Sequence, residues 1–268
     1  MLLFPNAKIN LGLHITEKRT DGFHNLQTCF YPVNWLDALE LIEVAALQFT
    51  SSGIEIPGAM EDNLCAKVYY AVKERYNIPP VHMHLHKNIP IGAGLGGGSA
   101  DAAFTLKALN RKFGLELSDD EMEDLVKPLG SDCAFFIKNK PVFAYGKGDE
   151  FESIDLSLKG YYIALVYPAI LIATKEAYSG VVPQKPAVPL KLVLQQDMSK
   201  WKDLLINDFE KTVFKNHSDL SAIKQQLYNA GAIYASMSGS GSCMYGIFAE
   251  PTELKFPKQY RTWQGELG

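Results

Sequence analysis

The sequence lacks the features that mark membrane and secreted proteins. Its longest apolar run, residues 161–173, contains Pro168 and is shorter than the roughly 20 residues that a transmembrane helix needs. Lys8 interrupts the apolar start of the chain, and no apolar core with a small-residue cleavage site follows it, so no secretory signal is visible. We therefore expect a cytoplasmic protein that does not bind membranes.

Cysteine is scarce, and neither sign of charge dominates. The four cysteines are widely spaced and never form a C-x-x-C pair, which favours reduced thiols over a disulfide framework or a zinc site. The 26 basic and 30 acidic residues give a formal net charge of −4. A chain with this balance has no extended basic surface, so we do not expect nucleic acid as a partner.

What the chain does have is the composition of a globular protein, with 47% hydrophobic and 21% charged residues. Its 268 residues are enough for one large or two ordinary domains. Stretches with an apolar period of two alternate with helical patterns, and the pattern resets near residues 150–160. We therefore expect two domains, at residues 1–152 and 153–268.

An early strand places two polar side chains on one face. Lys8 and Asn10 alternate with apolar residues, a period of two that predicts a strand with one buried face. A solvated strand face is the alternative interpretation of these two positions. The apolar residues of the strand are Ile9, Leu11, Leu13 and Ile15.

A glycine-rich loop at residues 90–103 is the most informative stretch. A strand with alternating histidines, residues 81–86, precedes it, and an amphipathic helix that Ser99 could cap follows it. Glycines let backbone N–H groups approach an anion closely, so the loop predicts a phosphate cradle at a helix N-terminus. A flexible linker is the alternative, which the adjoining helix disfavours.

Two known glycine fingerprints match this loop only in spacing. A dinucleotide-binding G-x-G-x-x-G should follow a strand buried on both faces, whereas the histidine strand alternates and is predicted to be half-exposed and antiparallel. A Walker A loop should have lysine where Gly98 stands. The cradle therefore belongs to neither class.

Phosphoryl transfer also needs a group that orients or deprotonates the acceptor and cations that balance charge. Asp132 follows Gly130 and Ser131 in a predicted tight turn, which makes it the candidate base, and Lys8 would keep it ionised. A turn or helix cap is the alternative role for Asp132. His82, His84 and His86 share a strand face, but we interpret them as polar surface positions and predict no metal site.

Four stretches together resemble the GHMP small-molecule kinases, in the order seen in that family. They are residues 5–11 (PNAKINL), the loop at 92–103, residues 130–132 (GSD) and residues 237–241 (MSGSG). Residues 21–28 (DGFHNLQT) and 61–64 (EDNL) narrow the resemblance to a member that phosphorylates a cytidine diphosphate ester of methylerythritol in the non-mevalonate isoprenoid pathway. The resemblance runs from about residue 4 to residue 248.

This resemblance implies an α+β protein with the two-domain GHMP kinase fold, in which the N-terminal domain is like ribosomal protein S5 domain 2 and the C-terminal domain is ferredoxin-like. ATP and Mg²⁺ are the implied cofactors, with Lys8 and Asp132 as the catalytic pair. The resemblance assigns ATP to Asn63, Pro90, Ile91, Gly92, Ala93, Gly94, Leu95, Gly96, Gly97, Gly98, Ser99 and Ala100. It assigns the substrate to Asn10, Phe23, His24, Tyr178, Ser238, Gly239 and Ser240, of which His24 would bind the cytosine edge while Phe23 and Tyr178 enclose the ring.

Two positions depart from the family pattern. Phe23 replaces the usual tyrosine, which keeps the stacking ring but loses a hydroxyl. Asp101 stands where serine or asparagine is common, and a carboxylate beside bound phosphate would be repulsive unless it points away or helps to hold Mg²⁺. The rival functions are another GHMP kinase, a non-catalytic nucleotide sensor and a purely structural protein.

Overall fold

The computed structural model describes residues 1–268, and their contacts divide the chain into two compact units. Unit 1 comprises Met1–Ala7, Trp35–Ile91 and Gly96–Lys140. Unit 2 comprises Lys8–Asn34, Gly92–Leu95 and Pro141–Gly268. Neither unit is one continuous stretch, and the chain passes from unit 2 to unit 1 inside the glycine loop.

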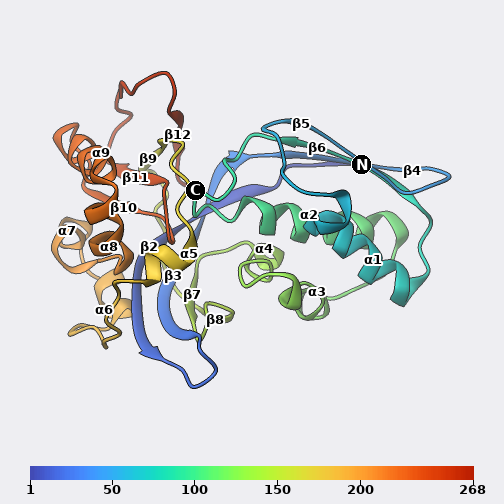
Figure 1. The fold of residues 1–268 in the computed structure, drawn as a ribbon, viewed down its shortest axis with the longest axis horizontal. Helices are drawn as coiled ribbons and strands as arrows, with labels where there is room; N and C mark the ends of the chain where they lie inside the picture. Colours follow the sequence, from blue (N-terminus) through green and yellow to red (C-terminus); the bar gives the residue numbers. More distant parts are fainter. The chain divides into compact units, whose positions relative to one another are not determined.

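Unit 1 is a mixed sheet with helices over one face. The sheet has the order β1-β4-β6-β5, in which β6 pairs antiparallel with β4 and parallel with β5. Helices α1 and α2 pack against each other beside this sheet (Figure 1). Its elements are β1 (Leu2–Leu3), β4 (Ala38–Glu43), β5 (Gln48–Gly53), β6 (Val81–Lys87), α1 (Leu64–Tyr76), α2 (Gly97–Phe113), α3 (Asp119–Val126) and α4 (Phe135–Lys138), with 3-10 turns at Met60–Asp62 and Lys127–Leu129.

Unit 2 holds two further four-stranded sheets, with the orders β2-β3-β7-β8 and β10-β11-β9-β12. Its strands are β2 (Asn6–Lys18), β3 (His24–Leu36), β7 (Val142–Tyr145), β8 (Glu150–Ser153), β9 (Tyr162–Tyr167), β10 (Tyr234–Met237), β11 (Met244–Phe248) and β12 (Arg261–Glu266). Its helices are α5 (Thr174–Tyr178), α6 (Leu190–Leu194), α7 (Trp201–Leu204), α8 (Phe209–Asn216) and α9 (Ser218–Asn229), with a 3-10 turn at Met198–Lys200.

The core of unit 2 joins the first and last thirds of the chain. Leu13 and Ile15 of β2 lie in one buried cluster with Val166 of β9, Val213 of α8 and Leu227 of α9. Helix α9 packs on β10 and β11, which pair antiparallel. This α+β arrangement confirms the predicted fold class, whereas the domain boundary at residue 152 stays a prediction.

Two local expectations are wrong. Strand β2 is buried on both faces, with Lys8 and Asn10 each only 3% exposed, because the rest of unit 2 covers the face that was expected to be solvated. Ser99 does not cap α2. The helix begins earlier, after Gly96 in the left-handed conformation with φ 69°, and Ser99 lies within its first turn. The histidine strand is half-exposed as predicted, but it is antiparallel on one side only.

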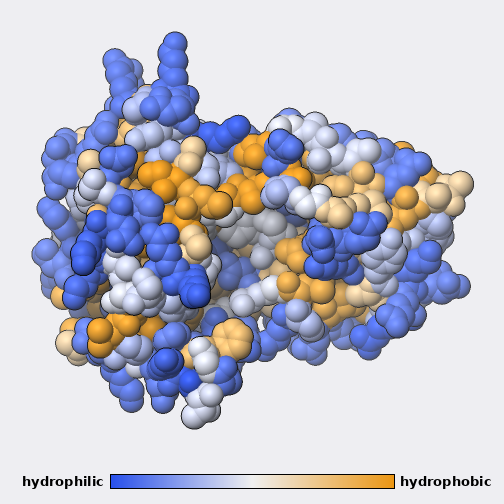
Figure 2. All heavy atoms as spheres, in the orientation of Figure 1, coloured by the Kyte–Doolittle hydropathy of each residue, from blue (hydrophilic) through white to orange (hydrophobic).

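The surface mixes polar and apolar residues. On the face drawn in Figure 2, hydrophilic residues predominate and hydrophobic ones are interspersed among them. The exposed large hydrophobic side chains include Phe23, Leu171 and Val182. None of the helices combines the length and apolar character required to cross a membrane.

Candidate functional site

Lys8 and Asn10 form a buried polar cluster in unit 2. The Lys8 ammonium donates to Asn10 Oδ1 at 2.6 Å and to the Gly94 carbonyl at 3.2 Å. The side-chain Nδ2 of Asn10 donates to the Thr28 hydroxyl at 3.0 Å, and the Thr28 hydroxyl in turn donates to the Gly12 carbonyl. These bonds hold the lysine against the first half of the glycine loop, which is where a cation acting on a phosphate should be.

The serine-glycine loop, residues 238–242 between β10 and β11, packs on the same half of the glycine loop. The Ser238 hydroxyl donates to the Gly94 carbonyl at 2.8 Å, and the Cys243 amide donates to the Ala93 carbonyl at 3.1 Å. Gly94 has φ 77°, and a Cβ there would lie 1.9 Å from the Ser238 carbonyl oxygen. Only glycine fits this position, so two predicted site segments contact each other directly. Gly239 is buried and Ser240 is half-buried in the same loop.

The second half of the glycine loop begins helix α2 in unit 1. The first N–H groups of a helix have no acceptor within it, so the amides of Gly97, Gly98 and Ser99 are available to an acceptor from outside α2. Gly98 is exposed, and a Cβ there would lie 4.0 Å from a Leu64 methyl at the start of α1. Asn63 is the N-cap of α1 and accepts the Cys65 amide at 2.9 Å, which places it beside this helix end.

Asp101 points away from the helix end into the interior of unit 1. Its Oδ2 accepts the Lys87 ammonium at 2.7 Å, and Lys87 also donates to Asp37, which accepts the amides of Asn88 and Ile89. Burial raises the pKa of Asp101 to about 7, with Asp37 adding to the shift and Lys87 opposing it. Asp101 is 3% exposed, only one of its two carboxylate oxygens is hydrogen-bonded, and the side chain therefore points away from any phosphate at the start of α2.

Asp132 lies in the predicted turn of unit 1. The turn spans residues 131–134, Asp132 is half-buried, and the Cys133 amide closes the turn onto the Gly130 carbonyl. Gly130 packs against Ser99, because a Cβ at Gly130 would lie 3.7 Å from the Ser99 hydroxyl. The turn therefore lies at the start of α2. Lys8 belongs to unit 2, and its pairing with Asp132 stays a prediction.

The predicted cytidine-binding residues gather at the β2–β3 hairpin of unit 2. The His24 ring stacks on the Tyr178 ring with centroids 4.8 Å apart and planes at 28°. Tyr178 also makes an edge contact with Phe209. Phe23 is 60% exposed, and the Lys147 ammonium lies 5.4 Å from its ring centroid. The structure thus brings His24 and Tyr178 together and leaves Phe23 at the surface.

The three histidines of β6 bond to side chains of the neighbouring strand β5. Thr50 contacts His82 and His84 at 2.8 Å each, and Ser52 contacts His84 and His86 at 3.0 Å each. The rings are spread along a ladder of hydroxyls and do not converge on one point. No group of three or more acidic, histidine or cysteine side chains is arranged to hold a metal ion.

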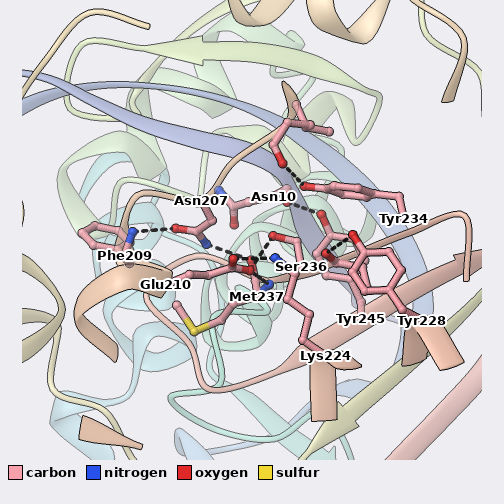
Figure 3. A network of polar contacts seen from close by, with 12 residues as sticks. Asn10, Asn207, Phe209, Glu210, Lys224, Tyr228, Tyr234, Ser236, Met237 and Tyr245 are labelled. Carbon is pink, nitrogen blue, oxygen red and sulfur yellow. Dashed lines mark hydrogen bonds and ion pairs between the residues drawn. The ribbon is translucent and has the colours of Figure 1, made fainter. Parts of the chain in front are cut away.

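Sequence reasoning missed the segment that supports the serine-glycine loop from behind (Figure 3). Asn207 is 2% exposed and donates to the carbonyls of Met237 and Gly239, and Glu210 accepts the Met237 amide. The sequence feature that could have indicated this segment is the pair Asn207-Asp208 with Glu210, polar residues that interrupt an apolar stretch. That pattern is ambiguous, because such residues also begin surface helices.

Comparisons with known proteins agree with this geometry. Residues 63–145 match the family "GHMP kinases N terminal domain", and residues 190–257 match "GHMP kinases C terminal". A "4-diphosphocytidyl-2-C-methyl-D-erythritol kinase" of Cytophaga hutchinsonii is 55% identical over 249 residues, which cover 92% of each chain.

The chain belongs to the GHMP kinase family.

Two further relatives span its whole length. A protein of Parabacteroides distasonis with the same name as the Cytophaga relative is 49% identical over 270 residues, covering 100% of both chains. The crystal structure of a 4-(cytidine 5'-diphospho)-2C-methyl-D-erythritol kinase superposes with a TM-score of 0.83 at 28% identity and covers 100% of this chain and 99% of its own. As a GHMP kinase, the chain is an enzyme that transfers a phosphoryl group to a small molecule, and this family implies ATP as the donor.

Proposed function

We propose that this GHMP kinase uses ATP to phosphorylate the 2-hydroxyl of 4-(cytidine 5'-diphospho)-2-C-methyl-D-erythritol in the non-mevalonate isoprenoid pathway. The observation that carries the proposal is the 49–55% identity, over nearly the whole chain, to relatives that bear the name of this kinase. The retention of Lys8, Asp132 and the glycine loop argues against a nucleotide sensor without activity.

In this proposal Asp132 accepts the proton of the substrate hydroxyl, and Lys8 balances the charge of the transferred phosphoryl group. The bonds from Lys8 to Asn10 and Gly94 support this role, since they fix the ammonium beside the loop. The amides at the start of α2 bind the phosphates of ATP, and Asn63 lies near the adenine.

Mg²⁺ enters with the nucleotide. This ion prefers oxygen donors and binds through one or two protein groups together with phosphates. The Ser99 hydroxyl at the start of α2 and the nearby turn of Asp132 supply oxygen atoms of this kind in unit 1, so these residues fit the ion. Its contribution is to neutralise the phosphate oxygens.

His24, Phe23 and Tyr178 bind the cytidine end of the substrate in this proposal. The stacked rings of His24 on β3 and Tyr178 on α5 support the assignment, because an aromatic pair contributed by two elements can open to admit a third ring. Ser238, Gly239 and Ser240 would approach the phosphates of the ester.

A substrate panel tests the function directly. Purified protein with Mg²⁺ and ATP is offered the cytidine ester, mevalonate, homoserine and galactose, and ADP formation is followed. We expect the ester to give the highest kcat/KM. Faster turnover of another alcohol would assign the chain to a different GHMP kinase, and intact ATP binding without turnover of any of them would favour the sensor.

Asp132→Asn tests the proposed base. Its amide has nearly the same size but cannot accept the proton, so we expect kcat to fall by roughly 100-fold or more, a typical size for loss of general base catalysis, with the Kd for ATP little changed. Steady-state kinetics and calorimetric titration with ATP measure the two quantities. An equal loss of ATP binding would return Asp132 to a structural role.

A further inference from the structure

Asn207 is held in one orientation by three backbone groups. Its Nδ2 donates to the Met237 carbonyl at 2.8 Å and to the Gly239 carbonyl at 2.9 Å, while its Oδ1 accepts the Phe209 amide at 3.0 Å. Two acceptors and one donor match the two N–H groups and the oxygen of a primary amide. No other side chain of this size offers the same set.

The two carbonyls that Asn207 binds flank Ser238. The Ser238 hydroxyl donates to Gly94 of the glycine loop, and Lys8 donates to the same carbonyl. The path from Asn207 to the cradle therefore runs through one residue of the serine-glycine loop. Asn207 therefore bonds to the backbone on both sides of Ser238.

The segment that follows Asn207 ties the same loop to strand β2. The Asp208 carboxylate accepts the backbone amide of Ile15 at 2.8 Å, and the backbone amide of Asp208 donates to the Leu13 carbonyl. Glu210 Oε1 accepts the Met237 amide at 2.8 Å, and its Oε2 accepts the Lys224 ammonium at 2.6 Å. Figure 3 shows Glu210 beside Asn207, Ser236 and Met237.

We propose that Asn207 is a positioning residue that fixes the serine-glycine loop against Gly94 and so aligns the acceptor substrate. The proposal rests on the proposed function, in which this loop approaches the phosphates of the ester. Asn207 itself touches neither substrate nor nucleotide. It acts by holding the two carbonyls beside Ser238, and a displacement of about 1 Å at a reacting centre can cost roughly 100-fold in rate.

Asn207→Asp removes both donors at constant size and sets a carboxylate against two carbonyls. We expect kcat/KM for the cytidine ester to fall by about tenfold to 100-fold, while the KM for ATP changes less than about threefold, since α2 binds the nucleotide. Hydrogen exchange of peptides covering residues 237–243, measured without ligand, should become faster than in the wild type. Exchange in β9 should stay slow.

The matched control is Asn229→Asp, the same chemical change at an exposed position where the side chain only accepts from Gln225. It should leave loop exchange and kinetics at wild-type values. If Asn207→Asp behaves like this control, or if exchange rises equally across unit 2, the inference is wrong.

Asn207→Ser keeps one hydrogen-bond donor and is the variant to use if Asn207→Asp does not fold. We expect its kcat/KM for the cytidine ester to be lower than in the wild type but not abolished. Wild-type values would overturn the inference. The exchange measurement needs no substrate. A wild-type protein that does not turn over the ester therefore refutes the proposed function, while loop exchange still decides the role of Asn207.

Discussion

Two buried lysines lie in different chemical surroundings. Lys87 is clamped between the carboxylates of Asp37 and Asp101 in unit 1. Burial alone would lower its pKa, but the two carboxylates raise it above the usual value. Lys8 instead contacts the Asn10 side chain and the Gly94 carbonyl. Lys87 therefore stabilises the start of α2, whereas Lys8 contacts the glycine loop, for which we propose a phosphate ligand.

The raised pKa of Asp101 makes stability depend on pH. With a pKa of about 7 in the folded protein against 3.8 as the ordinary value, the folded state binds a proton that the unfolded state releases between these limits. This group therefore lowers the free energy of unfolding as pH rises from about 4 to 7. Asp101→Asn should show a flatter dependence in urea unfolding over this range, and an unchanged slope would contradict the assignment.

Gly94→Ala should disrupt the contact between the glycine loop and the serine-glycine loop. The new methyl group would meet the Ser238 carbonyl at 1.9 Å, in addition to the roughly 1–2 kcal/mol that a left-handed alanine costs. Gly231→Ala is the control, because its φ is 96° and nothing lies within 4 Å. We expect both variants to lose stability but only Gly94→Ala to lose most activity. Equal activity would show that the loops tolerate separation.

Three helices of unit 1, α1, α2 and α3, begin in three different ways. Helix α3 begins with a capping box between Ser118 and Glu121. Helix α1 begins at Asn63, whose side chain accepts the Cys65 amide. Helix α2 has no side-chain cap and begins at Gly96. Of these three helices, α2 is the one without a side-chain cap and also the one proposed to bind phosphate, which can supply the missing acceptor.

Asn63→Ala separates the capping role from the proposed role in ATP binding. Loss of a side-chain cap costs about 1 kcal/mol of stability. Ser118→Ala removes a cap at α3 and is the control. Thermal unfolding should show similar losses in both variants, whereas steady-state kinetics should show a higher KM for ATP in Asn63→Ala alone. An unchanged KM would leave Asn63 as a cap only.

Local patterns predicted the elements, and long-range packing decided what they could not. The half-exposed histidine strand at residues 81–86 and the turn around Asp132 depend on neighbours in sequence, so both predictions are confirmed. The burial of Lys8 and the bonds of Asn207 depend on residues far away along the chain. Asp101 departed from the family pattern, and only its partner Lys87, 14 residues earlier, explains why a carboxylate is tolerated there.

At the scale of the whole molecule, the four cysteines are divided evenly between the units. Cys65 and Cys133 lie in unit 1, and Cys29 and Cys243 lie in unit 2. All four are buried. Burial raises the pKa of Cys65 to about 12 and that of Cys133 to about 11, and it raises those of Cys29 and Cys243 further. Such thiols do not react in the folded state.

Thiol labelling at neutral pH should therefore follow unfolding. We expect a chromogenic disulfide reagent to leave the native protein unlabelled for hours and to modify all four thiols in denaturant. At intermediate denaturant, labelling of Cys65 and Cys133 separately from Cys29 and Cys243, read by peptide mass spectrometry, would show that the units open independently. Rapid reaction of any thiol in the native protein would contradict the described burial.

Unit 2 is built from separate stretches of the chain, and this has a consequence for folding during synthesis on the ribosome. Strand β2 emerges among the first residues, yet its core partners Val213 and Leu227 follow some 200 residues later. Leu13 and Ile15 of the nascent hairpin therefore stay exposed to solvent while the rest of unit 1 is synthesised. The core of unit 2 then forms through contacts between residues far apart in the sequence. During that interval the chain presents an unprotected apolar strand, which is the kind of segment that chaperones bind.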